Sequence, residues 1–181
     1  MTSIRVAAAQ FTVGDDLEIN LQRCLSAIDE AAEGAAQLVV LPEFCNHLSW
    51  YRDGNHCWDV SVALDGPWLG SLAARARQHS LYLVVNATVR RGPGVTTGTS
   101  LLYSPDGALL GQSDKQVLMG HENDFLRRAQ HVCPVVDTAV GRIGMYSCMD
   151  GVINETPRSL ALRGAQILCN SLNSFAYDEG D

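Results

Sequence analysis

The chain has 181 residues, of which 46% are hydrophobic, and its formal net charge is −7. This composition is typical of a globular protein with a substantial core, and the charge argues against a nucleic-acid or anionic-membrane surface, because both need clustered Lys and Arg. No apolar run has the length of a membrane span and the N-terminus lacks a signal-peptide pattern, so we expect a cytoplasmic protein with one domain over residues 1–181, no nucleic-acid partner and no membrane contact.

The first half of the chain predicts strands that alternate with helices. Asp16 is expected to cap a helix whose apolar residues recur at helical spacing until Gly34, and Pro67 is expected to open a second helix. A long loop rich in aromatic residues should lie between the second strand and the second helix. The order β-α-β-α-β indicates a mostly parallel sheet covered by helices. The three strands are expected at residues 4–10, 37–41 and 81–89, the first two of them buried.

The second half predicts two hairpins, a helix and a final strand. Between the hairpins lies a polar, irregular segment, which is long for a loop and therefore suggests function. Asn154 is expected to cap the helix, which should run to Arg163. The strands are expected at 99–103 and 108–112 for the first hairpin, at 133–137 and 142–147 for the second, and at 166–169 for the last strand.

Three reactive side chains follow predicted strands: Glu43, Lys115 and Cys148. Reacting groups gather at the carboxyl ends of strands in α/β sheets, so these three side chains could share one pocket. A thiol at a strand-to-helix turn, near a helix N-terminus, is expected to have a lowered pKa and to be a nucleophile. A carboxylate can take its proton, and an ammonium group can stabilise the charge on a tetrahedral oxygen.

A buried lysine needs nearby carboxylates to keep its charge, and Glu122 is the candidate for a second one beside Lys115. Each residue also has an ordinary interpretation. Glu43 would then be a solvated loop acid, Lys115 a surface residue, and Cys148 a buried structural thiol.

Three separated segments resemble the nitrilase (carbon–nitrogen hydrolase) superfamily, in the order in which that superfamily has them. The segment VVLPEF at 39–44 resembles the one that carries the catalytic glutamate, and DKQVL at 114–118 resembles the lysine segment. The segment GRIGMYSCMD at 141–150, with the helix after it, is similar to the nucleophile segment. VAAAQ at 6–10 fits the first strand.

The resemblance implies an α/β fold of the αββα sandwich type, with four layers, and a Glu-Lys-Cys amidohydrolase that uses no metal and no cofactor. Glu43 would be the base, Cys148 the nucleophile that forms a thioester, and Lys115 with the backbone N–H of Met149 the oxyanion donors. Glu122 would hold Lys115 and orient the substrate. We expect a small-molecule amide or N-carbamoyl substrate, released ammonia or amine, and a homo-oligomer.

The chain also departs from the family pattern. Cys148 is followed by Met and Asp, which is closer to the amidase and carbamoylase branches than to true nitrilases. Pro157 comes two residues after Glu155, where the family often has a proline directly before that glutamate. Asp150, Glu155 and Arg158 are expected to form a supporting ion-pair group.

The chain stops before the C-terminal part of the family's second layer, so we expect an incomplete domain. An impaired chain that acts as an assembly subunit, a true nitrilase, and a thiol-based binding or redox module remain alternatives.

The six cysteines show no paired short spacing, and we expect free thiols. Cys45 and His47, with His56 and Cys57, could be considered as zinc ligands. Structural zinc sites normally show paired short spacings, so we favour a structured loop without a metal there.

Overall fold

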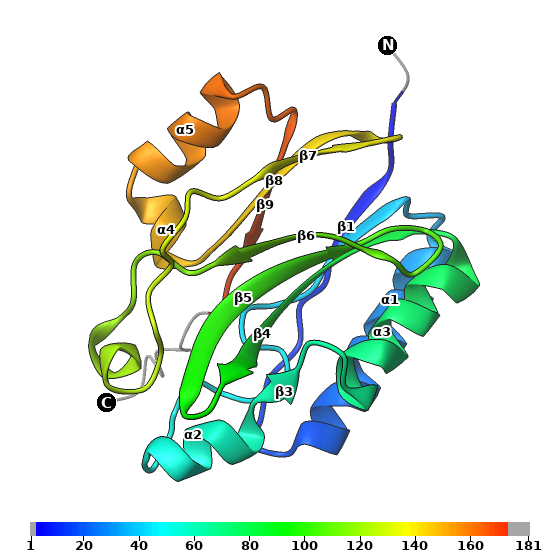
Figure 1. The fold of residues 1–181 in the computed structure, drawn as a ribbon. Helices are drawn as coiled ribbons and strands as arrows, with labels where there is room; N and C mark the ends of the chain where they lie inside the picture. The colour runs from blue at the N-terminus through cyan, green and yellow to red at the C-terminus, as the bar shows by residue number, and fades with distance from the viewer. Residues whose placement is uncertain (1–2, 174–181) are drawn as a thin grey trace, which may run out of the picture.

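The computed structural model describes residues 3–173, which form two β-sheets packed against each other between two layers of helices (Figure 1). The larger sheet has the order β1-β2-β4-β5-β6, with β3 paired to β4. Its strands are β1 (Val6–Ala8), β2 (Leu38–Val40), β3 (Val62–Ala63), β4 (Tyr82–Gly92), β5 (Val95–Tyr103) and β6 (Leu109–Asp114). The smaller sheet consists of β7 (Val135–Thr138), β8 (Gly141–Ser147) and β9 (Ile167–Ser171).

The helices lie on the outer faces of the two sheets. α1 and α3 cover the larger sheet, while α4 and α5 lie beyond the smaller one (Figure 1). None of the helices in residues 3–173 is long and apolar enough to cross a membrane. The bounds are α1 (Leu17–Glu33), α2 (Gly54–Val60), α3 (Pro67–His79), α4 (Met149–Val152), α5 (Glu155–Leu162) and the 3-10 helix η1 (Gly120–Asp124).

The predicted β-α-β-α-β order is confirmed, because β1, β2 and β4 are parallel and are joined through α1 and α3. The Asp16 carboxylate accepts the N–H groups of Glu18 and Ile19 and so caps α1, and Gly34 is the C-cap residue. Pro67 opens α3, where its missing N–H removes no hydrogen bond. Local sequence signals therefore placed these helix ends correctly.

Both predicted hairpins are present. β5 pairs antiparallel with β4 and with β6, and β7 pairs antiparallel with β8. β9 adds to β8 in parallel. β5 begins four residues earlier than expected, at Val95, because the Thr- and Gly-rich start of the strand carries no apolar alternation that would mark it as a strand.

Two expectations for the N-terminal half were wrong. The expected long loop contains α2 and β3, and α2 is capped by Asp53, whose carboxylate accepts the N–H of His56 at 2.8 Å. A seven-residue helix is too short to show an apolar periodicity. β1 is not buried, since Val6 is 55% exposed. Its apolar sequence suggested burial on both faces, but within residues 3–173 β1 is an edge strand that pairs with β2 alone.

Two hydrophobic cores account for the four layers. One lies between the larger sheet and α1 and α3, and includes Ile28, Leu72 and Val85. The other lies between the two sheets, where Val84 of β4 packs in the same cluster as Met145 of β8. Full burial of such a side chain contributes about 1.5–3 kcal/mol. The four-layer αββα arrangement is thus confirmed by packing, and it aligns the ends of β2, β6 and β8.

Candidate active site

Glu43 lies in a tight turn after β2. Its side chain is 3% exposed, and the next residue, Phe44, has a positive φ of 50°. The N–H of Phe44 donates to the Asn86 side chain of β4 at 2.9 Å, which holds this turn. A Cβ on Gly98 would lie 2.8 Å from the Phe44 ring, so the bare backbone of β5 leaves the space that the turn needs. The local structure therefore turns the Glu43 carboxylate inward.

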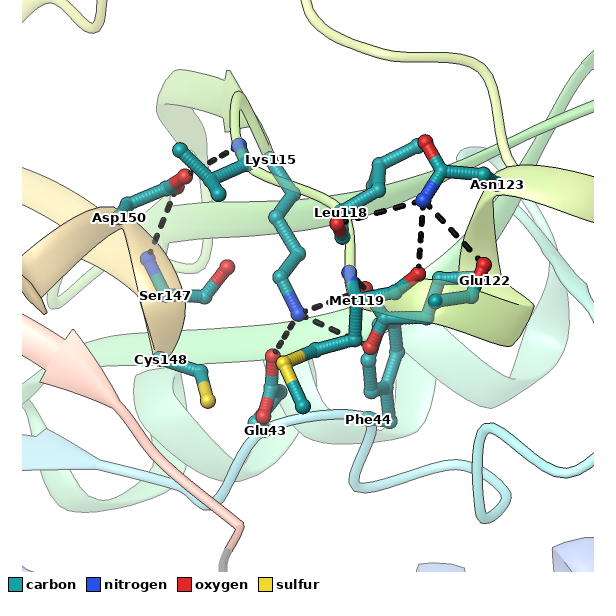
Figure 2. A network of polar contacts seen from close by, with 12 residues as sticks. Glu43, Phe44, Lys115, Leu118, Met119, Glu122, Asn123, Ser147, Cys148 and Asp150 are labelled. Atoms are coloured by element: carbon teal, nitrogen blue, oxygen red, sulfur yellow. Dashed lines mark hydrogen bonds and ion pairs between the residues drawn. The ribbon is translucent and has the colours of Figure 1, made fainter. Parts of the chain in front are cut away.

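Lys115 follows β6 directly and is 1% exposed. Its Nζ donates to Glu43 Oε1 at 2.7 Å and to the Glu122 carboxylate at 2.9 Å (Figure 2). Nζ also lies 5.1 Å from the centre of the Phe44 ring. Two carboxylates and an aromatic face thus surround a cation that would otherwise be too costly to bury.

Glu122 lies in η1, within the segment for which the sequence predicts an irregular loop. It is 3% exposed, and besides contacting Lys115 it accepts the backbone N–H of Met119 at 2.9 Å. Because Met119 is the N-cap residue of η1, this bond ties the carboxylate to the start of its own helical turn. Glu122 is therefore held rigidly beside Lys115.

Cys148 stands between β8 and α4 in a strained conformation, with φ 45° and ψ −109°. Its N–H donates to Asn170 Oδ1 at 2.7 Å and to the Ser171 carbonyl at 3.0 Å. Strain of this kind costs about 1–3 kcal/mol and persists where neighbours over-determine the geometry. Cys148 is also the one cysteine of the six that is not buried. The fold therefore presents this thiol and hides the other five.

The sulfur of Cys148 faces the Glu43 carboxylate (Figure 2), and the two side chains are close enough that a hydrogen bond between them affects the pKa of both. The backbone N–H of Met149 acts on this sulfur by lowering its pKa. The structure thus brings Glu43, Lys115, Glu122, Cys148 and the Met149 N–H into one cluster. They come from three regions of the chain that are far apart in sequence: Glu43, residues 115–122 and residues 148–149.

The expectation of a lowered thiol pKa was wrong for the free protein. Burial, and then the negative charge of Glu43, raise the pKa of Cys148 to about 11, although Lys115 acts in the opposite direction. Burial also raises the pKa of Glu43 against the influence of Lys115. A turn near a helix N-terminus suggested a thiolate, but the adjacent carboxylate and the loss of water favour the neutral thiol.

Burial disfavours the charge on Lys115, but Glu43 and Glu122 outweigh this effect and raise the pKa of Lys115. The lysine is therefore a fixed positive charge at neutral pH. A carboxylate whose pKa is raised, a neutral thiol and a fixed cation form a set that can move one proton and stabilise one developing negative charge.

The model of the carbon-nitrogen hydrolase family matches residues 5–180. The chain belongs to this family. The resemblance found in its sequence motifs is thereby confirmed. The match extends over nearly the whole chain, so the Glu43, Lys115 and Cys148 segments all fall within the matched region.

Relatives in the family support this assignment. The chain is 27% identical to the nitrilase and fragile histidine triad fusion protein NitFhit of Caenorhabditis elegans, covering 90% of this chain and 39% of that protein. It is 28% identical to the human omega-amidase NIT2, covering 93% of this chain and 63% of that one. The chain therefore spans about two fifths of the length of NitFhit and about three fifths of the length of NIT2.

A solved structure is similar in fold. It is a double mutant of the amidase from Nesterenkonia sp. AN1, with a glutamate and a cysteine replaced, in complex with acrylamide. It superimposes with a TM-score of 0.85 and 26% identity, covering 97% of this chain and 67% of that one.

The expected ion-pair group of Asp150, Glu155 and Arg158 was wrong. Asp150 is fully buried and its carboxylate accepts main-chain N–H groups, from Gln116 at 3.0 Å and from Val117 at 2.7 Å. Burial raises the pKa of Asp150 against these bonds. Within residues 3–173 neither Glu155 nor Arg158 forms an ion pair. The sequence showed opposite charges nearby, but only the fold revealed that unpaired backbone donors were closer.

The side chains considered as zinc ligands do not converge. Cys45 packs in the core against α1, whereas Cys57 contacts the Thr96 hydroxyl at 3.4 Å in a different cluster. His47 and His56 meet edge to face, with ring centres 5.4 Å apart. The described part of the chain contains no group of three or more His, Cys, Asp or Glu side chains arranged to hold a metal ion.

Sequence reasoning missed two asparagines. Asn86 holds the Glu43 turn, and Asn170 holds the Cys148 backbone. Gly151 provides room for Asn170, since a Cβ there would lie 2.8 Å from Asn170 Nδ2. A polar residue in an otherwise apolar strand was the available signal in both cases.

Proposed function

We propose that the protein is a thiol-dependent amidohydrolase that cleaves a non-peptide C–N bond of an amide or N-carbamoyl compound. The observation that carries this proposal is the placement of the Lys115 ammonium between two buried carboxylates, with the only unburied thiol facing one of them. The burial of three charges and the strained Cys148 backbone both cost free energy in the folded state. The proposed reaction gives a reason for both costs, because it needs a charged oxyanion donor beside the base and a thiol held in one position.

In the first half-reaction, the sulfur of Cys148 attacks the carbonyl carbon while Glu43 takes the thiol proton. The raised pKa of the thiol makes this concerted transfer preferable to a preformed thiolate. The raised pKa of Glu43 brings the base closer to neutral pH, where a general base works best.

The carbonyl oxygen becomes negative as the C–S bond forms. Lys115 Nζ and the backbone N–H of Met149 are the donors that would stabilise it, since one lies beside Glu43 and the other lowers the pKa of the reacting sulfur. A single donor of this type is worth about 3–4 kcal/mol in the transition state. Glu122 keeps Lys115 charged and in place.

Collapse of the tetrahedral intermediate breaks the C–N bond. The proton on Glu43 goes to the leaving nitrogen, which departs as ammonia or an amine, and the acyl group remains on Cys148 as a thioester. In the second half-reaction Glu43 takes a proton from water, the hydroxyl adds to the thioester carbon, and the proton returns to the departing sulfur. The acid product is then released, and the free thiol of Cys148 is restored.

The amide or N-carbamoyl class is supported by the relatives that are named amidases, and by the Met and Asp residues that follow Cys148. Mass spectrometry of the intact protein after incubation with primary amides and N-carbamoyl amino acids tests the proposal. We expect an acyl adduct on Cys148 that decays as the acid product accumulates, with no adduct in Cys148→Ala and an unchanged adduct in Cys169→Ala. Turnover with no dependence on Cys148, or no turnover of any amide or carbamoyl compound, would contradict it, and reaction with nitriles alone would assign a true nitrilase.

A further inference from the structure

A cavity of about 260 Å³ lies outside the Glu43–Lys115–Cys148 cluster. Its walls are the end of β6 and the segment 127–134, together with Arg91 of β4, and none of the three catalytic candidates lines it. It is therefore separate from the place where the proposed chemistry occurs.

Three arginines line this cavity, and two of them lack a carboxylate partner. Arg91 pairs with Asp114 at 2.5 Å and also donates to Thr97 at 3.0 Å, so its guanidinium is occupied. Within residues 3–173, Arg127 and Arg128 form no ion pair, and Arg128 donates only to the neutral Asn123 side chain, at 3.1 Å. Two guanidinium groups without a counter-charge at one cavity are unexpected in a chain whose net charge is −7.

The wall of the cavity is also held in place. The N–H of Arg127 donates to the Thr96 carbonyl at 2.8 Å, and the N–H of Ala129 donates to the Lys115 carbonyl at 2.9 Å. The backbone that carries the two arginines is thus anchored to β5 and to the residue that follows β6. An anchored loop loses less conformational entropy when a ligand binds.

We propose that this cavity binds a small oxyanion, either a carboxylate or a phosphate group, through Arg127 and Arg128. The planar guanidinium group matches the paired oxygens of both anions and forms charge-assisted hydrogen bonds with them. Arg127 and Arg128 are both exposed, so an anion in the cavity can reach them from solvent. Arg127 and Arg128 are adjacent in sequence and both line the cavity, and the site requires no chemistry at Cys148.

Calorimetric titration of the protein with inorganic phosphate, and separately with succinate, tests this proposal at constant ionic strength. We expect saturable binding of at least one of the two anions. The anion that binds more tightly shows whether the site prefers a phosphate or a carboxylate group. In the double variant Arg127→Gln/Arg128→Gln, the affinity should fall by at least about tenfold, since each charge-assisted hydrogen bond is worth roughly that factor. Cys148→Ala should bind as the unchanged protein does, which separates this site from the proposed active site.

Arg77→Gln is the matched control, because Arg77 is an exposed arginine of α3 that does not line the cavity and forms no ion pair in residues 3–173. It removes one positive charge from the same molecule, so a general effect of net charge would appear there. The proposal is overturned if neither anion binds saturably, if the double variant binds as well as the unchanged protein, or if Arg77→Gln weakens binding as much.

Discussion

Asp150 Oδ1 accepts the backbone N–H of Val117 at 2.7 Å, which joins the helix after the nucleophile to the segment after the lysine. The same oxygen accepts the N–H of Gln116, and Oδ2 faces the N–H of Ser147 at 3.4 Å. One buried carboxylate thus links the backbone that follows Lys115 to the backbone that precedes Cys148. Its position suggests how two segments more than thirty residues apart keep the register that the proposed reaction needs.

Asp150→Asn should destabilise the protein and slow catalysis. The amide keeps one acceptor oxygen but turns an NH2 group towards a backbone donor, and a buried donor without a partner costs about 1–3 kcal/mol. Urea denaturation and kcat would measure the two effects. Asp137→Asn is the control, because the carboxylate of Asp137 is exposed and its one ion pair within residues 3–173 is with Arg142. Equal stability of the two variants would contradict this role of Asp150.

The stability gap between the unchanged protein and Asp150→Asn should depend on pH. Burial raises the pKa of Asp150 in the folded state, so the folded state holds this proton more tightly than the unfolded state does. The stabilisation is complete below the ordinary pKa of about 4 and is lost as the pH rises through the folded-state pKa. Denaturation curves should be measured between pH 4 and pH 7, at about unit steps. The difference in free energy of unfolding between the unchanged protein and Asp150→Asn should become smaller as the pH rises. A gap that widens with pH would mean that the folded-state pKa is lowered.

Glu43→Gln should separate thiol reactivity from turnover. Because the charge of Glu43 helps to raise the pKa of Cys148 to about 11, its removal should move the midpoint of alkylation by iodoacetamide to lower pH. Burial remains, so the shift is partial. Hydrolysis should nevertheless fall by at least about a hundredfold, since the general base is gone. Cys169, whose pKa burial raises to about 12, serves as the internal control and should stay slow in both proteins. Faster alkylation of the unchanged protein than of the variant would contradict the geometry.

Lys115→Met should lower kcat by about a hundred- to a thousandfold, which corresponds to the loss of one oxyanion donor. It should also destabilise the fold by about 3–5 kcal/mol, because Glu43 and Glu122 are left buried without their cation. The double variant Lys115→Met/Glu122→Gln should recover part of the stability but none of the activity. Recovery of both, or near-normal turnover of the single variant, would show that Lys115 has no catalytic role.

Asn170→Ala should lower kcat by about tenfold with little change in KM, because the Cys148 N–H loses its 2.7 Å acceptor and the nucleophile is less well positioned. The variant Asn170→Asp keeps an acceptor and adds a negative charge near the thiol. It should therefore restore backbone positioning but move the alkylation midpoint to higher pH. An alkylation profile that is the same in Asn170→Ala, Asn170→Asp and the unchanged protein would leave Asn170 with a packing role only.

The sequence alone predicted much of the fold. Apolar runs, Asp16 at a helix start and Pro67 in a first turn are local signals, and each corresponds to an element in the structure. Short motifs around Glu43, Lys115 and Cys148 pointed to one site because reactive residues stood directly after strands. Both kinds of signal depend on neighbours along the chain, which a sequence shows directly.

Only the tertiary structure decided the electrostatics and the supporting contacts. The pKa of Cys148 depends on its burial and on a carboxylate more than a hundred residues away, and the sequence contains neither quantity. Asp150 bonds to backbone N–H groups instead of to Arg158, because hydrogen-bond partners are set by which buried donors the fold leaves open. Asn86 and Asn170 looked like isolated polar residues in strands until the sheets placed each beside the turn that it holds. The identity of the reacting groups was thus encoded locally, while their protonation and precise placement arise from contacts between segments distant in sequence.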